Sequence, residues 1–381
     1  MSLFFLAGEK SGDLLGARLV KELRSEHQIW GVGGQNMRAA GLEPLLYTEA
    51  FEAMGVTDTL LRLPQIVGQF KKVQHAILEK KPAACILIDY PGFNLRLASA
   101  LRKKGYAGKI VQYVSPTVWA WGKDRIEKMN SSLDLLLSIF PFEQPLLKEK
   151  NFTFNYVGNP IFESVKTHNY EEGWHKLFGI RQPEKVIALF PGSRRSEVHL
   201  NLPLQLQAAE LILQNIPDAE FALSCAQEEM MPLVHCLLSD CPLKLNKNLF
   251  LIPKRFSYEL MRDAQGAIAK SGSVTLELAL HETPTVVMYQ ISALNRFFAK
   301  YILKLSLKHY CIVNILHGQT VFPELIETKV TAEKLASNLL EMYFAGSLRT
   351  SCLEACRSIP DLLGDHNTSY KAAEAIRELL R

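Results

Sequence analysis

The chain has 381 residues, which predicts two domains at roughly 150 residues per domain. Its 43 basic and 39 acidic residues give a formal net charge of +4, an excess too small to indicate nucleic-acid binding by itself. Hydrophobic residues make up 48% and charged residues 22% of the chain, which excludes disordered, collagen-like and coiled-coil proteins.

The first part of the chain alternates short apolar runs with longer helical patterns. These predict strands at 3–7, 29–32, 84–88, 109–114, 133–138 and 154–156, and helices at 14–25, 66–79, 94–104, 123–129 and 141–148. Continuous apolar strands joined by helices indicate a parallel sheet that is covered on both faces.

The same alternation starts again after about residue 165. Strands are predicted at 186–190, 221–224, 249–252, 267–269 and 285–288, and helices at 200–214, 229–238, 257–262, 273–280 and 332–344. We therefore expect two parallel α/β domains, at 1–165 and 166–351, and a helical tail at 352–381 that packs back on one of them.

The cysteines and histidines predict neither disulfides nor a metal centre. The seven cysteines contain no CxxC pair, and the ten histidines supply no HExxH motif. No apolar run approaches the ~20 residues that span a bilayer, and the apolar N-terminus lacks the basic region of a signal peptide. We expect a reduced cytoplasmic protein without metal or cofactor.

Two polar loops follow predicted strands in the first domain, where open parallel sheets bind ligands. In AGEKSGD, Ser11 or Asp13 can cap the next helix, but Glu9 is not needed for a turn. In IDYPGFN, Asp89 ends a wholly apolar strand, where lost solvation raises the pKa of a carboxyl group and makes it a better base. A helix cap is the structural alternative for Asp89, but Asn94 fits that role, so we favour a functional one.

A third loop, PGSRR, lies between a strand and a helix in the second domain. Gly192 lets backbone amides approach an anion, Ser193 offers a hydroxyl group, and Arg194 offers a planar cation suited to phosphate.

A fourth loop opens the segment KSGSVTLELAL. The N–H groups at Ser271, Gly272 and Ser273, at the start of a predicted helix, form a second anion site. Glu277 lies about one turn further, among apolar neighbours, and ribose hydroxyls would be suitable partners for a buried carboxylate. Anion loops in one domain and a desolvated carboxylate in the other suit a transferase with a nucleotide-diphosphate donor.

Two basic and apolar stretches, one per predicted domain, indicate an interfacial or acyl-chain contact. A core-packed helix with a solvated basic face is the alternative for each of them. Their candidate contact residues are Phe297, Phe298, Lys300 and Lys304 in the second stretch, and Met54, Ile66, Val67 and Phe70 in the first.

These motifs resemble those of the lipid-A-disaccharide synthase family, glycosyltransferases of the GT-B architecture. The resemblance spans nearly the whole chain in order, through AGEKSGD, MGVTD, IDYPGFN, YVSPTVWAWGKDR, FPFE, YVGNP, FPGSRRSEV, SGSVTLE and NILHGQTVFPELIE. It implies two Rossmann-like parallel-sheet domains that face a central cleft, the first for the acceptor lipid and the second for the UDP-sugar.

The resemblance also implies a reaction. UDP-2,3-diacylglucosamine and 2,3-diacylglucosamine 1-phosphate would give the β-1,6-linked disaccharide 1-phosphate and UDP, with inversion at the anomeric carbon. Asp89 matches the family's essential aspartate, as the base or as a group that orients the acceptor. Arg194, Glu277 and Asn314 match activity-critical positions, and Ser271 and Ser273 would contact the diphosphate. Position 327, a Glu where the family usually has Gln, is left out of the site.

The implied partners are the two lipid substrates and an anionic membrane surface, with no nucleic acid. The implied location is the cytoplasm, at the inner face of the inner membrane. Two rival functions are a UDP-N-acetylglucosamine 2-epimerase, which acts on a soluble nucleotide sugar, and a non-catalytic lipid-binding protein that kept the fold.

Overall fold

The computed structural model describes residues 1–51, 63–117, 125–225, 230–239, 241–290 and 308–381. The chain forms two compact units, which we call unit 1 (1–163 with 363–381) and unit 2 (164–362). The predicted limit at 165 lies close to the end of the first segment of unit 1 at 163, whereas the predicted limit at 351 lies before the end of unit 2 at 362. In particular, α16 (Ser347–Leu363) passes through residue 352 as one helix, so no element starts at the predicted beginning of the tail.

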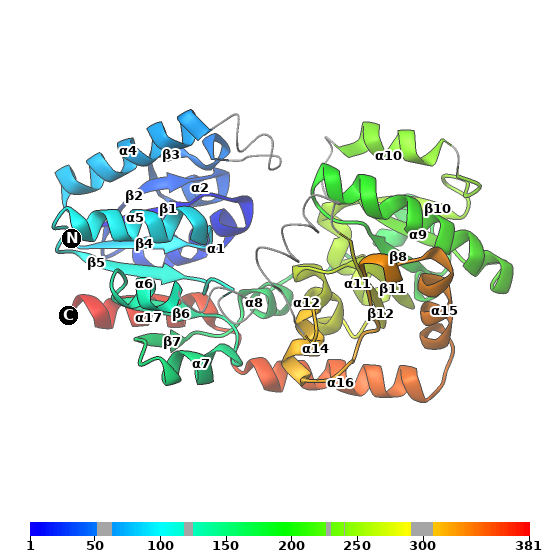
Figure 1. The fold of residues 1–381 in the computed structure, drawn as a ribbon. Helices are drawn as coiled ribbons and strands as arrows, with labels where there is room; N and C mark the ends of the chain where they lie inside the picture. The colour runs from blue at the N-terminus through cyan, green and yellow to red at the C-terminus, as the bar shows by residue number, and fades with distance from the viewer. Residues whose placement is uncertain (52–62, 118–124, 226–229, 240, 291–307) are drawn as a thin grey trace. The chain divides into compact units, whose positions relative to one another are not determined.

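Unit 1 is built on a seven-stranded parallel sheet with the order β3-β2-β1-β4-β5-β6-β7 (Figure 1). Its strands are β1 (Ser2–Ala7), β2 (Gln28–Gly33), β3 (Glu43–Tyr47), β4 (Ala84–Ile88), β5 (Lys109–Tyr113), β6 (Leu135–Ser138) and β7 (Phe154–Tyr156). The order reverses between β1 and β4, so the loops that follow these two strands flank a topological switch point.

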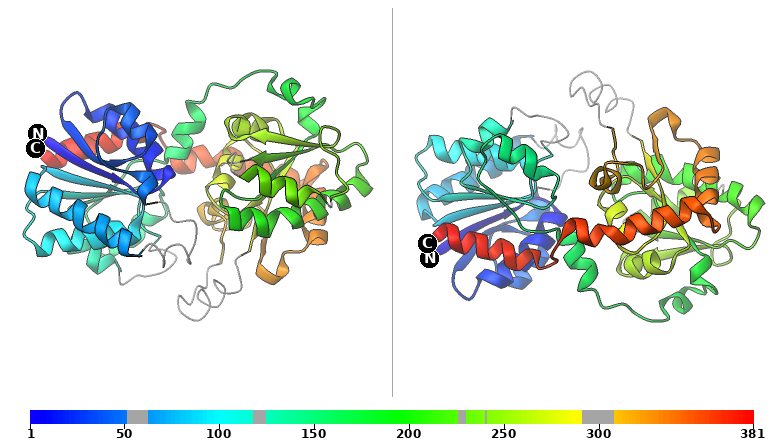
Figure 2. Two further views of the ribbon diagram at one scale, coloured as in Figure 1. Left: turned by 90° about the horizontal axis from the view of Figure 1, so that it is seen from above. Right: turned by 90° about the horizontal axis from the view of Figure 1, so that it is seen from below.

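Helices cover both faces of this sheet, because successive side chains of a strand point to opposite faces. Phe5 of β1 packs in one apolar core with α1 and α17, whereas Phe4 packs in the other with α4 and α5. Figure 2 shows α17 along the face that carries α1. The helices are α1 (Lys10–Leu23), α2 (Gln35–Ala40), α4 (Leu63–Lys80), α5 (Pro91–Lys103), α6 (Arg125–Asn130), α7 (Glu143–Glu149) and α17 (Thr368–Leu380). A further helix, α8 (Pro160–Lys166), begins in unit 1 and ends in unit 2.

Unit 2 repeats the design with six parallel strands in the order β10-β9-β8-β11-β12-β13. Its switch point lies between β8 and β11. The strands are β8 (Ile187–Phe190), β9 (Phe221–Cys225), β10 (Leu249–Pro253), β11 (Gly266–Lys270), β12 (Thr285–Tyr289) and β13 (Glu324–Ile326). The helices are α9 (Arg195–Asn215), α10 (Met231–Leu238), α11 (Ser257–Asp263), α12 (Ser273–Leu280), α14 (Ile312–His317), α15 (Ala332–Tyr343) and α16.

The expected α/β class, with two Rossmann-like parallel sheets, is confirmed. The sequence prediction missed β3 and β13, which are edge strands without a fully buried residue. It also started α1, α5 and α9 several residues late, because their first turns carry the polar loop motifs. No helix in the described part of the chain is long and apolar enough to cross a bilayer.

Candidate functional site

The two loops at the switch point of unit 1 touch each other. Ser11, in the first turn of α1, donates a hydrogen bond from Oγ to Oδ2 of Asp89 at 3.2 Å. A Cβ atom on Gly8 would lie 2.5 Å from the ring of Tyr90, so only glycine allows this approach. Burial raises the pKa of Tyr90, and the charge of Glu9 acts in the same direction. Glu9, Ser11 and Asp89 therefore lie near one another at the carboxyl ends of the central strands β1 and β4.

Asp89 is a half-buried carboxylate with neutral hydrogen-bond donors. Burial raises its pKa above the ordinary value of an aspartate. The hydroxyl of Ser11 and the backbone N–H of Tyr90 act against that rise. A carboxyl group with a raised pKa holds a proton more tightly than a free aspartate, which is the property required of a general base.

The backbone around Asp89 has left-handed dihedral angles that disfavour L side chains. The φ angles are 51° at Asp89, 43° at Tyr90 and 73° at Val114. The side-chain amide of Gln112 donates to the carbonyl oxygens of Asp89 at 2.9 Å and of Val114 at 3.1 Å. Asn94 donates to the carbonyl oxygen of Asp89 at 2.6 Å. Two fully buried amides thus hold a strained turn in place.

This arrangement corrects the role predicted for Asn94. α5 begins at Pro91 with Tyr90 as its N-cap, so Asn94 lies inside the helix and does not cap it. Proline is well suited to the first helical position, because its fixed φ matches the helix and its missing N–H needs no partner.

The predicted caps of α1 are wrong as well. α1 begins at Lys10 with Glu9 as N-cap and no side-chain cap, so neither Ser11 nor Asp13 has that role. The buried carboxylate of Asp13 instead accepts backbone hydrogen bonds from Gly34 at 2.7 Å and Met37 at 3.0 Å. Asp13 therefore fixes the first turn of α2.

The third loop forms an anion-binding turn that is filled by the protein itself. The backbone N–H groups of Ser193 and Arg194 donate to Oε2 of Glu197 at 3.0 and 3.3 Å. Gly192 has φ +124°, and a Cβ atom there would lie 2.6 Å from the same oxygen. The side chains of Ser193 and Arg194 are exposed.

The carboxylate of Glu197 also reaches the neighbouring strand. Its Oε1 lies 3.1 Å from Nζ of Lys270, the last residue of β11. The charge of Lys270 and the loop amides lower the pKa of Glu197 against the opposing effect of its burial. The contact joins the two loops that flank the switch point of unit 2.

The fourth loop lies on the same switch point. Ser271 is buried and its Oγ donates to the carbonyl oxygen of Tyr310 at 3.0 Å. Gly272 and Ser273 are exposed at the start of α12. Because β8 and β11 are hydrogen-bonded neighbours, both predicted anion loops end adjacent parallel strands.

Glu277 lies in the second turn of α12 and is half-buried. Tyr258 donates to its Oε1 at 3.3 Å, and burial raises its pKa while Tyr258 and the charge of Lys254 oppose the rise. One carboxylate oxygen thus has a protein donor in α11, as expected for a partly buried acid.

Asn314 occupies a position that favours an indirect role. It is fully buried, and its Oδ1 accepts from the backbone of Val321 at 2.8 Å and Phe322 at 2.9 Å. Its Nδ2 donates to Phe322 and to the carboxylate of Glu324. These contacts fix the loop that leads into β13, so a direct catalytic role for Asn314 stays a prediction.

The candidate acyl contacts are described only in part. Ile66 and Phe70 of α4 pack against the apolar core of unit 1, with the rings of Phe70 and Phe93 5.3 Å apart. Val67 is 47% exposed. Packing in the core therefore accounts for Ile66 and Phe70, as expected for the alternative of a core-packed helix. Met54, Phe297, Phe298, Lys300 and Lys304 lie outside the described residues.

Sequence reasoning missed Glu197, Lys270 and Gln112. Lys270 ends an apolar strand, the same signal that selected Asp89, and Glu197 lies in a first helical turn. Gln112 is a polar residue inside an otherwise apolar strand, a pattern that marks a buried hydrogen-bonding role. Within the described ranges, no three His, Cys, Asp or Glu side chains are grouped to hold a metal ion.

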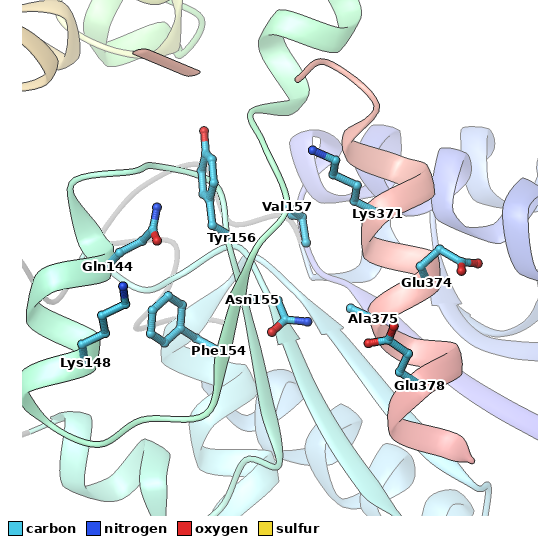
Figure 3. A pocket seen from close by; sticks show the side chains of 10 residues that line it. All are labelled: Gln144, Lys148, Phe154, Asn155, Tyr156, Val157, Lys371, Glu374, Ala375 and Glu378. Carbon is cyan, nitrogen blue, oxygen red and sulfur yellow. The ribbon is translucent and has the colours of Figure 1, made fainter. Parts of the chain in front are cut away.

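A hollow of about 610 Å³ lies elsewhere in unit 1. Figure 3 shows it along the edge strand β7, between α7 and α17. Its charged lining consists of Lys148, Lys371, Glu374 and Glu378. It is distinct from the loops after β1 and β4.

Known proteins resemble the chain over almost its full length. A lipid-A-disaccharide synthase of Chlamydia pneumoniae is 35% identical over 382 residues, covering 99% of this chain and 59% of that protein. One of Trichlorobacter lovleyi is 32% identical over 385 residues, covering 99% and 97%. The chain thus spans about three fifths of the length of the first chlamydial relatives.

The structure of a UDP-GlcNAc 2-epimerase from Neisseria meningitidis bound to UDP-GlcNAc shares the fold, with a TM-score of 0.69 at 11% identity. That similarity covers 99% of this chain and 100% of the other. The model of the lipid-A-disaccharide synthetase family matches residues 3–377. The chain therefore belongs to the lipid-A-disaccharide synthetase family.

Proposed function

We propose that the chain is a glycosyltransferase that condenses two acylated glucosamines into a lipid A disaccharide. The donor is UDP-2,3-diacylglucosamine and the acceptor is 2,3-diacylglucosamine 1-phosphate. The products are the β-1,6-linked disaccharide 1-phosphate and UDP. The observation that carries the proposal is that the PGSRR and SGS loops end the hydrogen-bonded neighbouring strands β8 and β11, in a chain that belongs to this family.

In this proposal unit 2 binds the UDP-sugar. Arg194 and the exposed N–H groups at Gly272 and Ser273 hold the diphosphate, and Glu277 accepts from the ribose hydroxyls. As the bond to the sugar breaks, negative charge grows on the leaving UDP. Fixed dipoles and a guanidinium group at that position stabilise this charge better in the transition state than in the bound donor.

Unit 1 supplies the acid–base chemistry. Inversion needs a single displacement with oxocarbenium character, by analogy with inverting glycoside hydrolysis. The oxygen of the acceptor 6-hydroxyl attacks the anomeric carbon, its proton passes to Asp89, and the bond to UDP breaks. A raised pKa suits Asp89 to this step, and its strained turn fixes the direction of the carboxylate.

Contact with an anionic membrane surface, on the cytoplasmic side of the inner membrane, completes the proposal. It rests on the basic and apolar pattern of the sequence. Replacing Phe297, Phe298 and Lys300 together with polar or acidic residues is expected to weaken liposome binding and leave UDP affinity intact. Unchanged liposome binding would contradict this part of the proposal.

The decisive experiment is incubation of the purified chain with both lipid substrates, followed by mass analysis. A disaccharide 1-phosphate and stoichiometric UDP are expected, with and without EDTA, and both should form far more slowly with the Asp89→Asn variant. A donor-only reaction tests the epimerase alternative, since an epimerised sugar without disaccharide would favour it. Lipid binding without turnover, unaffected by Asp89→Asn, would instead favour a non-catalytic lipid-binding protein.

A further inference from the structure

The Glu197–Lys270 pair has features that helix capping does not explain. A glutamate in the first helical turn needs only backbone N–H partners to cap the helix, and the loop provides two. The second oxygen of Glu197 nevertheless binds the ammonium group of Lys270, at the end of strand β11. Lys270 and Glu197 are 22% and 18% exposed, so solvent and ligands reach both side chains.

The carboxylate of Glu197 is an anion held by backbone amides, the kind of contact that a helix N-terminus offers to a phosphate group. It accepts from two consecutive backbone amides at the start of a 21-residue helix, where the helix dipole favours an anion. It also neutralises a cation between the two loops. An arriving diphosphate and Glu197 therefore compete for the same donors.

We propose that Lys270 is a ligand of the donor diphosphate, and that Glu197 holds its ammonium group at the loop until the diphosphate replaces the carboxylate. This inference rests on the proposed function, because it extends the UDP-sugar site by one residue. Lys270 is a compact point charge on a flexible stem, so it can turn from a carboxylate to a phosphate oxygen while its backbone stays in β11.

The test is the affinity of the full chain for UDP and for uridine, measured by calorimetry on three variants. Lys270→Met is expected to weaken UDP binding by about ten- to a hundredfold, the effect of one hydrogen bond between charged groups. It should leave uridine binding unchanged, because uridine has no phosphate. Lys270→Arg should restore most of the UDP affinity, which separates lost charge from a damaged fold.

The Glu197→Gln variant shows whether the Glu197 carboxylate competes with the diphosphate or only supports the loop through its hydrogen bonds. The glutamine oxygen can still accept from the loop amides, but the negative charge is gone, so UDP should bind several times more tightly. Lys185→Met is the matched control, because Lys185 is an exposed lysine beside the opposite, amino end of β8. It should bind UDP like the parent chain.

The outcomes separate two failures. If the parent chain binds UDP no better than uridine, the proposed function fails and this inference fails with it. If the parent chain prefers UDP and Lys270→Met keeps its affinity, or loses uridine affinity equally, only this inference is wrong. Unchanged or weaker UDP binding by Glu197→Gln would overturn the competition between carboxylate and diphosphate.

Discussion

The two switch points have the same topology and opposite electrostatics. In unit 1 the loops after β1 and β4 bring Asp89 to a neutral hydroxyl, and burial raises its pKa. In unit 2 the loops after β8 and β11 bring Glu197 to Lys270 and two backbone amides, and its pKa is lowered. Topology decides where a carboxylate lies, whereas its hydrogen-bond and charge partners decide in which direction its pKa shifts.

Two glutamates in first helical turns extend this comparison. Glu143, the first residue of α7, is 2% exposed, and its burial raises the pKa to about 8. The hydroxyl of Ser115 and the backbone groups of Phe140 and Ile139 act against the rise. Glu197 is also buried in part, but Lys270 and the backbone amides of Ser193 and Arg194 reverse the direction of its pKa shift. A neighbouring lysine and two backbone amides therefore lower the pKa of one glutamate, whereas deeper burial raises the pKa of the other.

The largest effect is expected from Asp89→Asn. The variant keeps the shape of the side chain and removes the proposed base, so kcat should fall by about 10²- to 10⁴-fold. UDP affinity should stay unchanged, because unit 2 provides the proposed nucleotide site. Steady-state disaccharide synthesis and UDP calorimetry on the same preparation measure both. A kcat within a few-fold of the parent would mean that Asp89 only orients the acceptor.

Glu143→Gln tests the raised pKa of a buried carboxyl group. With a folded-state pKa of about 8 and an ordinary value of 4.5, folding takes up a proton between these pH values. The stability contributed by protonated Glu143 is complete below pH 4.5 and is lost as the pH rises to 8, by a total of a few kcal/mol. Glutamine cannot ionise, so the variant should lose this dependence and be the more stable protein at pH 8.

Urea unfolding between pH 5.5 and 8.5, with hydrogen exchange in β6 as the local probe, measures this difference. Glu149→Gln is the matched control, since Glu149 is an exposed glutamate on the same helix. It should keep the parent pH dependence. Equal slopes in the parent and in Glu143→Gln would show that Glu143 is ionised in the folded chain.

The sequence predicts the strand ends better than the contacts between them. Asp89 and the PGSRR loop were found because a polar residue or glycine ends an apolar run, and this signal is local. The strained turn at Asp89 was not found, because the amides that hold it come from β5 and the interior of α5. Likewise, the partner of Glu197 lies on a strand far along the chain, and only the order of strands brings it close.

A substitution at Glu277 tests the proposed nucleotide site in unit 2. If its carboxylate accepts from the ribose, Glu277→Ala should weaken UDP binding by roughly tenfold. The variant should also lose the preference for UDP over 2′-deoxy-UDP, which a general loss of stability would not remove. The control is Glu282→Ala, an exposed glutamate just after α12 that pairs with Arg357. A retained preference for UDP would assign the ribose contact to another residue.

The smallest and most specific effect is expected from Ser11→Ala. The hydroxyl of Ser11 stabilises the charged form of Asp89, so removing it should raise the pKa of Asp89 further. The base works only when deprotonated, and the acid limb of kcat/KM should therefore move to higher pH while the plateau changes little. Ser25→Ala makes the same chemical change at an exposed site just beyond α1 and should leave the limb in place. An acid limb that does not move in Ser11→Ala would mean that a group other than Asp89 sets the acid side of the profile. The opposite pKa shifts of Asp89 and Glu197 would then have no effect on the rate-limiting step.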